Sequence, residues 1–358
     1  MRIATLSNAA VVHTHRWVDH LRMRGHEVRV YSLERGPKEL GAIELPAVAL
    51  PGWLRYPLAV PALRRALADF APDLIDAHYV PNYGAMGALL GRHPLSVAAW
   101  GSDLLVAGRR DRLQRARARS ILRAADLVIC DSGNLADAAL ELGAPRATLR
   151  AIPWGVDRTR FAPGPARESG LLLSTRMHET VYDIPALLHG VAPLMQKHPG
   201  LSLVLAGDGS LLAEHEALAA RLLPAGQYRF LGRINSAELA DWLGRASVYL
   251  SASRSDSTSL SLLEAMAAGA IPVVSDIEGN REWVGPDDGA RLFAPGDAAG
   301  VTRAIEAALA EPAWCETARE RNARVIEERG DWAINFGHIE TAFEALVAGR
   351  PLPSAGAR

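Results

Sequence analysis

The chain is poor in cysteine, in lysine and in long apolar runs, and each shortage excludes a class of protein. Its 358 residues include two cysteines, Cys130 and Cys315, too few for a disulfide framework, so a reducing, cytoplasmic location is expected. Lys38 and Lys197 are the only lysines, in an expected loop and at an expected helix end, and neither is placed for a pyridoxal cofactor. No stretch approaches the ~18 apolar residues of a membrane span, and the first ten residues are interrupted by polar side chains, unlike a signal peptide.

The net charge is small but unevenly distributed. The chain carries 39 basic and 40 acidic residues, a formal charge of −1, which predicts no nucleic-acid partner. Residues 1–160 hold 22 basic against 15 acidic residues, or +7, whereas the remainder holds 17 against 25, or −8. A basic half suggests contact with something anionic. An arginine-rich composition without such a partner is the alternative.

A dinucleotide fingerprint is missing after the first strand-like segment. RIATLS is followed by NAAVVHTHRW rather than by GxGxxG. The glycines of that fingerprint form a tight turn and let the backbone approach a pyrophosphate. Their absence disfavours a nicotinamide-dependent dehydrogenase.

Short apolar or β-branched runs alternate with segments of helical periodicity along the chain. The runs include RIATLS, EVRVYSL and LVIC in the first half, and LLLST, LSLVLAG and IPVVS in the second. Runs that are apolar throughout predict parallel sheets covered on both faces. Among the helices between them, we expect segments at 83–90, 109–124, 184–197 and 260–268.

A stretch rich in proline and glycine, residues 153–170, predicts a boundary between two such domains. We expect an N-terminal Rossmann-like domain at 1–160 and a C-terminal one at 161–330. A last helix at about 332–348 is expected to pack back on the N-terminal domain. The expected fold class is α/β, with two doubly wound domains facing across a cleft, and ligands of such sheets bind beyond the carboxyl ends of the strands.

The segment SRSDSTSLSLLEAMAAGAIPVVSD places two carboxylates, Asp256 and Glu264, around the start of an expected helix. Residues 257–259 are each suited to cap that helix, and Gly269 suits its end. The free N–H groups of a helix start bind anions such as a diphosphate, and carboxylates accept hydrogen bonds from ribose or sugar hydroxyls. The alternative is structural, with Asp256 as a helix-start charge and Glu264 as a solvated side chain.

This segment resembles the paired-acid region of glycosyltransferase family 4, the glycosyl transferases group 1. LVLAGDGS, YRFLGRI, IPWGVDRTRF and GNREWV also resemble family segments, so that the resemblance covers most of the chain. It implies a retaining enzyme with the GT-B fold, which moves a sugar from a nucleotide-diphosphate sugar to a hydroxyl. UDP-sugars are the favoured donors and GDP-sugars the second choice. It also implies no cofactor and no metal, because arginine and helix starts neutralise the diphosphate.

On the donor side, the resemblance implies that Glu264 holds the ribose and that Asp256 contacts the transferred sugar. Arg176, in LLLSTRMHE, matches an arginine that pairs with the diphosphate. The family's lysine about five residues later is absent from TVYD, so Arg254 or Arg233 is the expected substitute. The donor-binding residues are expected to be Ser257, Thr258, Ser259, Leu260, Gly207, Arg233 and Ile234.

On the acceptor side, HTHRW, AHYVPNYG and AWGSD each follow an expected strand and resemble family segments. Trp100 stands where the family often has histidine, and it suits stacking on a sugar or, alternatively, burial at a strand end. Asp103 is the candidate for orienting the acceptor, and we group it with Arg176, Asp256 and Glu264 as catalytic. The acceptor-binding residues are expected to be His13, His15, Arg16, His78, Tyr83 and Trp100. No carboxylate or cysteine nearby completes a metal site with the first two histidines.

The segment Arg109–Arg123 carries seven arginines and a thin apolar face. Such a helix suits peripheral contact with the anionic inner face of a membrane, close to a lipid-linked acceptor. A solvated helix with an apolar inner side is the alternative.

These observations predict a metal-independent, retaining hexosyltransferase of glycan, lipid-linked saccharide or glycoconjugate biosynthesis. Its partners are expected to be a nucleotide sugar and a saccharide, lipid-linked saccharide or small-molecule acceptor. A sugar-nucleotide epimerase or hydrolase on the same fold is one alternative, and it would release nucleoside diphosphate without an acceptor. A non-catalytic partner of another transferase is a second, and it would bind the donor without transfer.

Overall fold

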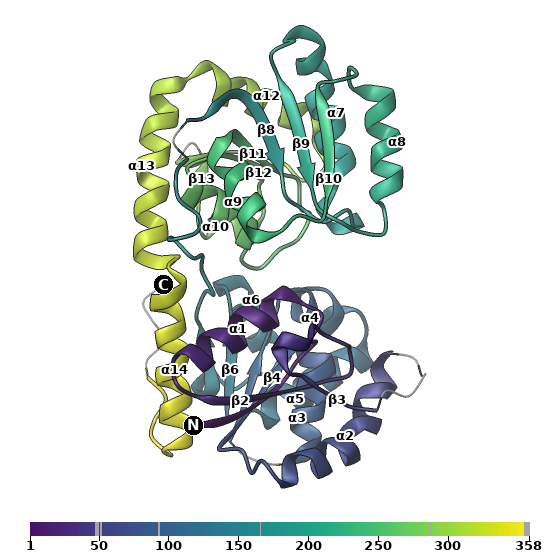
Figure 1. Cartoon of the computed structure of the whole chain (residues 1–358), viewed down its shortest axis with the longest axis vertical. Helices are drawn as coiled ribbons and strands as arrows, with labels where there is room; N and C mark the ends of the chain where they lie inside the picture. Colours follow the sequence, from purple (N-terminus) through teal and green to yellow (C-terminus); the bar gives the residue numbers. More distant parts are fainter. Residues whose placement is uncertain (47–49, 51, 92–93, 165, 287, 354–358) are drawn as a thin grey trace. The chain divides into compact units, whose positions relative to one another are not determined.

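The chain forms two compact units, each built on a parallel β-sheet. A computed structural model describes residues 1–46, 50, 52–91, 94–164, 166–286 and 288–353. The first unit combines Met1–Ile152 with the segment from Gly337 onward, and the second is Pro153–Phe336. Helices cover both faces of each sheet (Figure 1). The predicted α/β class with two doubly wound domains is therefore confirmed.

The sheet of the first unit has the strand order β3-β2-β1-β4-β5-β6-β7. All its strand pairs are parallel. The strands are β1 Arg2–Leu6, β2 Glu27–Ser32, β3 Ile43–Glu44, β4 Leu74–His78, β5 Leu95–Ala98, β6 Leu127–Cys130 and β7 Leu149–Ala151. The helices are α1 Val12–Met23, α2 Gly52–Ala68, α3 Ala85–Leu90, α4 Ser102–Leu105, α5 Arg112–Ala124 and α6 Gly133–Leu142.

The sheet of the second unit has the order β10-β9-β8-β11-β12-β14-β13. Its strands are β8 Glu168–Ser174, β9 Ser202–Ala206, β10 Tyr228–Gly232, β11 Ala246–Ser251, β12 Ile271–Ser275, β13 Gly285–Pro286 and β14 Gly289–Phe293. Its helices are α7 Ile184–Lys197, α8 Leu212–Leu222, α9 Ser236–Arg245, α10 Leu260–Ala268, α11 Glu278–Arg281, α12 Ala298–Ala310 and α13 Pro312–Arg329. Both sheets place the third, second, first and fourth strand of the unit side by side, which is the Rossmann-like arrangement.

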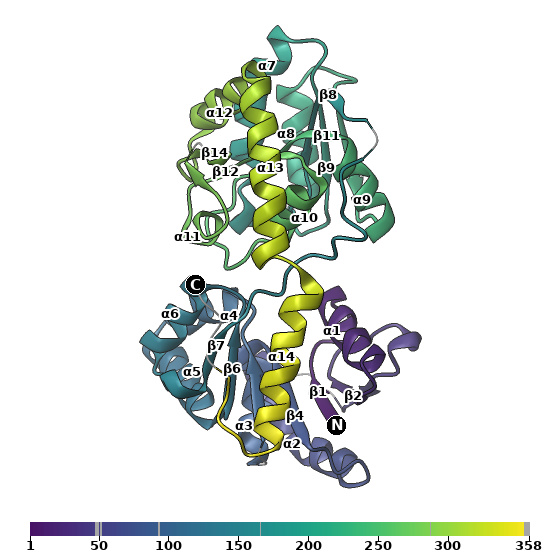
Figure 2. The same cartoon turned by 90° about the vertical axis from the view of Figure 1, so that its left-hand side faces the viewer.

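The last helix, α14 Trp332–Val347, lies against the first unit over its C-terminal part (Figure 2). Its Glu340 accepts hydrogen bonds from Arg24 at 3.0 Å and is 3.0 Å from His26 Nε2. The ring of Phe343 lies 6.5 Å from that of Trp17. These contacts join the end of the chain to α1 and to the start of β2.

The sheet edges explain where a site can form. Central strands such as LIDAH and LVIC are buried along their whole length. The polar residues that follow these strands therefore lie together at the carboxyl edge of the sheet. The turn after β4 departs from the expected helix at 83–90. It is a π-helix over Tyr79–Gly84, entered through Tyr79 with φ of 68°, and α3 begins only at Ala85. Similarly, α5 begins at Arg112 rather than at residue 109, because Asp111 caps it by accepting from the Gln114 N–H.

Candidate active site

The guanidinium of Arg176 is the centre of a polar cluster in the second unit. Arg176 follows β8, and its side chain is 8% exposed. It donates to Asp256 at 2.6 Å, to Ser259 at 2.8 Å and to Ser261 at 2.7 Å. The ring of Tyr182 stacks on it, 4.2 Å from the guanidinium carbon. Two of the predicted catalytic residues, far apart in the sequence, are thus brought into direct contact.

The charge of Arg176 survives burial because of its partners. Burial alone would lower the pKa of Arg176, but the carboxylate of Asp256 more than reverses this and the net pKa is raised. The guanidinium is therefore a fixed positive charge in a buried site. Such a charge interacts more strongly with an anion than it would in water.

The helix α10 starts beside this cluster, as the sequence predicted. Ser259 is the N-cap, and its hydroxyl accepts from the Leu262 N–H at 3.4 Å. Gly269 ends the helix with φ of 76°. Ser257 and Thr258, which precede the cap, are buried, and Leu260 is half-buried. The predicted donor-binding loop is therefore packed into the second unit.

The loop before α10 achieves its path without glycines of its own. Residues 256–259 do not have positive φ angles, so they need no strained conformation. Space comes instead from Gly279 in α11, where a Cβ atom would overlap the carbonyl oxygens of Asp256 and Ser257. Sequence reasoning missed Gly279 because its role depends on a close approach between segments 22 residues apart.

Glu264 lies within α10, half-buried, one turn beyond the cap. Arg233 and Ile234 directly follow β10, exposed and half-buried respectively. Arg254, an expected substitute for the family's lysine, instead pairs with Asp183 at 2.8 Å and is 58% exposed. Arg254 is thus paired with a carboxylate of the second unit.

Two loops at the carboxyl edge are locked together around Gly207. Its φ is 154°, and a Cβ there would overlap the carbonyl oxygen of Arg176, which explains why glycine stands at this predicted donor-binding position. Next to it, His178 and His215 place their Nδ1 atoms 2.9 Å apart. Burial lowers the pKa of His178 to about 4, so the pair is neutral near pH 7. This pair joins α8 to the loop of Arg176, and sequence reasoning did not identify it.

A cavity of about 300 Å³ lies in the first unit, at the carboxyl ends of β1, β4 and β5. Its lining includes three of the predicted acceptor-binding residues, His78, Tyr83 and Trp100. The other lining residues are Ser7, Asn8, Val11, Tyr56, Tyr79 and Asn82. Most of this wall is aromatic or carries an uncharged hydrogen-bonding group.

The remaining acceptor-side predictions lie on α1. His13 is half-buried and meets Trp100 edge to face with ring centroids 5.9 Å apart, and burial lowers its pKa to about 4. His15 places Nε2 2.7 Å from the carbonyl oxygen of Ala9, and Arg16 is half-buried. These three residues do not line the cavity.

The structure buries Asp103, whereas the sequence predicted that it orients the acceptor. Its side chain is fully buried, and its carboxylate accepts from the backbone N–H groups of Val80 at 3.0 Å, Trp100 at 3.1 Å and Leu104 at 3.1 Å. Burial raises its pKa to about 6. This geometry makes Asp103 a positioning residue that holds two loops of the cavity wall.

A carboxylate that sequence reasoning missed organises the opposite wall. Glu34 accepts hydrogen bonds from the hydroxyls of Tyr56, at 3.2 Å, and Tyr83, and it pairs with Arg55. The Tyr83 hydroxyl also accepts from the Leu33 N–H at 2.8 Å. Burial raises the pKa of Tyr83 to about 12. Glu34 lies 49 residues before Tyr83, so no local pattern links them.

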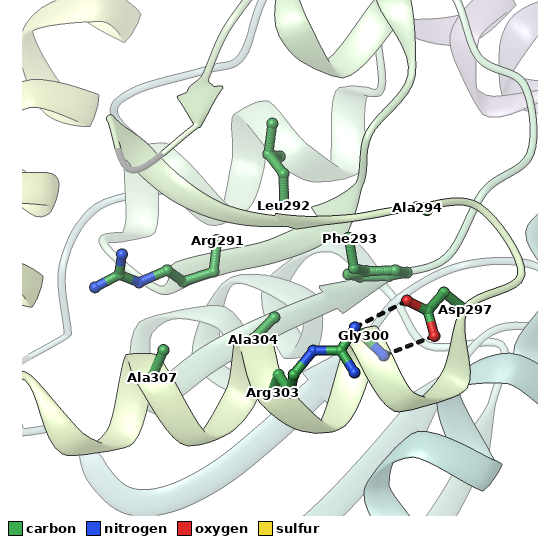
Figure 3. A pocket seen from close by; sticks show the side chains of 9 residues that line it. All are labelled: Arg291, Leu292, Phe293, Ala294, Asp297, Gly300, Arg303, Ala304 and Ala307. Carbon is green, nitrogen blue, oxygen red and sulfur yellow. Dashed lines mark hydrogen bonds and ion pairs between the residues drawn. The ribbon is translucent and has the colours of Figure 1, made fainter.

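A second groove, of about 340 Å³, lies between β14 and α12 (Figure 3). Its arginines are paired, Arg291 with Glu311 at 2.9 Å and Arg303 with Asp297 at 3.1 Å. Asp297 also accepts from the Gly300 N–H at 2.8 Å and caps α12. No predicted site residue lines this groove, and we assign it no part in the chemistry.

The described residues include neither a metal-binding cluster nor a membrane-spanning helix. Within the described ranges, no group of three or more His, Cys, Asp and Glu side chains is arranged to hold a metal ion. Of the helices in the part of the chain that the structure covers, none is long and apolar enough to cross a membrane.

Comparison with solved structures defines the class of fold. Sucrose-phosphate synthase from Thermosynechococcus elongatus superposes with a TM-score of 0.84 at 21% identity, over 98% of this chain and all of that one. Anabaena HepE in complex with UDP-glucose superposes with a TM-score of 0.81 at 18% identity, over 97% of this chain and all of that one. The fold is therefore GT-B.

Comparison of sequences defines the family. The profile of the glycosyl transferases group 1 matches residues 157–328, and that of glycosyltransferase family 4 matches residues 10–160. Glycogen synthase of Mycobacterium tuberculosis is 30% identical over 296 residues, which are 81% of this chain and 65% of that protein. The chain belongs to glycosyltransferase family 4, and it spans less than two thirds of the length of that curated relative.

Proposed function

We propose that the protein is a retaining glycosyltransferase that moves a sugar from a UDP-sugar to a hydroxyl acceptor. The observation that carries this is the buried cluster of Arg176, Asp256 and Ser259 at the start of α10. It combines a fixed guanidinium charge with helix N–H groups, the two features that bind a diphosphate. The bound UDP-glucose of HepE, a protein of the same fold, supports uridine as the base.

In the proposed reaction, the bond between the anomeric carbon and the diphosphate oxygen breaks, and a bond to the acceptor oxygen forms on the same face. The acceptor proton passes to the leaving diphosphate, so no protein base is required. Arg176 and the start of α10 stabilise the charge that develops on the leaving group. Asp256 and Glu264 hold the transferred sugar and the ribose by accepting hydrogen bonds from hydroxyls.

The three hydrogen-bond partners of Arg176 suit a site that changes on donor binding. Arg176 currently donates to Asp256 and to two serine hydroxyls. We propose that a bound diphosphate takes the place of Asp256 on the guanidinium, which releases Asp256 for the sugar. We propose metal independence because Arg176 and the helix start supply the positive charge that a metal would otherwise provide.

The assay that tests this proposal follows the anomeric configuration by proton NMR. UDP-glucose and its GDP counterparts are incubated with the protein and a panel of neutral and phosphorylated sugar acceptors, with EDTA present. Transfer with the anomeric configuration of the donor is the expected result. Inversion contradicts the proposal, and release of UDP equally fast without acceptor supports the hydrolase or epimerase alternative. Donor binding without any transfer supports the non-catalytic alternative.

We also propose peripheral contact with an anionic membrane through α5, in a cytoplasmic protein whose two cysteines are free and buried. Arg112, Arg115, Arg119 and Arg123 are all exposed on this helix. Leu113 on this helix is 62% exposed, and Val106, six residues before the helix begins, is 54% exposed. Exposed apolar side chains among arginines favour an interfacial helix over a solvated one.

A further inference from the structure

We propose that the cavity of the first unit binds a neutral saccharide, one of whose hydroxyls donates a hydrogen bond to Nδ1 of His78. Asp76 is the positioning residue that fixes the imidazole for this contact. The inference deepens the acceptor side of the proposed function and rests on it. It names the chemical class of the acceptor substrate and the protein atom that accepts its hydrogen bond.

The hydrogen bonds of Asp76 determine the tautomer of His78. Asp76 is fully buried in β4, and its Oδ2 accepts from the indole N–H of Trp17 at 2.9 Å. The same oxygen lies 3.0 Å from Nε2 of His78. Since an ionised carboxylate only accepts, the Nε2 atom carries the hydrogen. In a neutral imidazole with this tautomer, the other ring nitrogen is the hydrogen-bond acceptor.

Among the residues that the structure describes, none is a hydrogen-bond partner of that second nitrogen. Nδ1 of His78 is buried and has no hydrogen-bond partner among the described residues, although His78 itself is 1% exposed and lines the cavity. A buried acceptor left without a hydrogen bond is destabilising. A ligand hydroxyl supplies the missing donor, whereas a phosphate oxygen, which only accepts, does not.

The imidazole cannot turn away to find another partner. Its ring lies 4.7 Å from that of Trp17 and 5.7 Å from that of Trp100. Asp76 holds one nitrogen, and the two indoles enclose the ring. The position of the free acceptor atom is therefore fixed before any ligand arrives, which lowers the entropic cost of binding.

The described lining of the cavity offers no cation to an anionic ligand. None of the described lining residues is an arginine or a lysine. Arg55, which lies next to lining residue Tyr56, pairs with Glu34, so its charge is already neutralised. A phosphorylated sugar would lose water without gaining a cation. Four lining aromatic rings and the amides of Asn8 and Asn82 suit the apolar faces and the hydroxyls of a sugar ring.

The backbone at the cavity is shaped in a way that is common at binding sites. The lining residue Tyr79 adopts φ of 68° and begins the π-helical turn Tyr79–Gly84. Positive φ at a bulky residue costs free energy and persists where surrounding structure enforces it. The volume of about 300 Å³ is at the small end of ligand pockets, which fits one sugar residue.

The test is a titration of ¹⁵N-histidine-labelled protein, followed through the ring nitrogens of His78. The probes are methyl glycosides of glucose, mannose and galactose, with glucose 6-phosphate as the charged comparison. We expect the Nε2–H tautomer in the free protein and a shift of the Nδ1 signal with a neutral glycoside. An Nδ1–H tautomer, no shift with any glycoside, or tighter binding of the phosphate would each overturn the proposal.

Three variants separate positioning from folding. His78→Phe keeps an aromatic ring but removes the acceptor atom, and Asp76→Leu removes the oxygen that holds Nε2 of His78. Each should lower kcat/KM for the acceptor by about tenfold or more, with UDP affinity unchanged within about twofold. Thr5→Val is the matched control, because Thr5 is also buried in this sheet with a hydroxyl that lacks a partner among the described residues. It should leave kcat/KM unchanged.

The outcomes distinguish this inference from the proposed function. The titration needs no donor, so it gives an answer even if transfer is never seen. UDP binding and transfer to phosphorylated acceptors, with His78→Phe as active as the wild type, would remove the inference and leave the transferase. A shift of the His78 signal with glycosides, without any UDP binding, would keep the inference and contradict the proposed transferase.

Discussion

At the scale of single residues, the donor site depends on a guanidinium that stays charged while buried. The side chain of Arg176 is 8% exposed, yet the neighbouring carboxylate of Asp256 keeps the pKa of Arg176 raised. A buried charge of this kind is costly when unpaired and useful when an anionic ligand arrives. The same chain uses the opposite strategy at Asp103, a buried carboxylate surrounded by backbone N–H groups.

Replacing Arg176 with alanine should lower the rate of transfer far more than the stability. Loss of one group that stabilises a developing charge typically costs about 10²–10³ in kcat. Arg176→Lys keeps a charge but loses the planar fork, so it should recover only part of the activity. The measurement is kcat/KM for the donor, with circular dichroism to confirm folding. Near-wild-type turnover of Arg176→Ala would remove this residue from the mechanism.

The raised pKa of Asp103 makes stability depend on pH. Because the folded pKa, about 6, lies above the ordinary value of 3.8, the folded state binds more protons between these values. The contribution of Asp103 is therefore most favourable below pH 3.8 and declines as the pH rises through 6. Relative to Asp103→Asn, the free energy of unfolding of the wild type should fall by roughly 2 kcal/mol between pH 4.5 and 7. Urea unfolding of both proteins measures this, and a constant difference contradicts it.

At the scale of elements, the start of α10 and the loop before it form the donor-binding surface. The helix cap is local, since Ser259 accepts from Leu262, but the path of the loop is not. It depends on Gly279, which leaves room for the carbonyl oxygens of Asp256 and Ser257. A single added methyl group at that glycine must move the loop.

Gly279→Ala should therefore weaken UDP binding by about tenfold, since overpacking of this kind costs about 1–3 kcal/mol. Gly200→Ala is the matched control, because a Cβ there meets nothing within 4 Å. Isothermal titration of both variants with UDP makes the comparison. Equal affinities would show that the loop tolerates the displacement and that its path does not set donor binding.

The basic helix α5 gives a prediction of its own. Arg115→Glu combined with Arg119→Glu should reduce co-sedimentation with phosphatidylserine vesicles by at least tenfold, because each arginine near an anionic surface contributes about 1 kcal/mol. Arg221→Glu with Arg229→Glu changes the charge equally at exposed positions of the second unit and should leave sedimentation unchanged. Equal sedimentation of both double variants would favour the solvated alternative.

At the scale of the whole molecule, the sequence predicted what is periodic or local and missed what is distant. The bounds of α7 and α10 are those expected at 184–197 and 260–268. Each segment carries an apolar stripe, and α10 is also flanked by a serine cap and a terminal glycine. The π-helix at Tyr79–Gly84 was missed, since one extra residue in a turn leaves no periodic trace.

The same division holds for the site. Arg176 and Asp256 were proposed from separate motifs, and the structure joins them at 2.6 Å. The Glu34–Tyr83 contact and the His178–His215 pair could not be predicted, because their partners lie 49 and 37 residues apart. Asp103 follows a strand, as the sequence predicted, but its burial depends on three backbone N–H groups that no side-chain pattern reveals.

The central claim is that the second unit binds a nucleoside diphosphate through Arg176 and the start of α10. Isothermal titration of the wild type and of Arg176→Ala with UDP, GDP and ADP, in the presence of EDTA, tests it most directly. The account predicts that UDP binds the wild type best, unaffected by EDTA, and that Arg176→Ala binds at least about tenfold more weakly. Binding that requires a divalent metal, or equal binding by the variant, would contradict it.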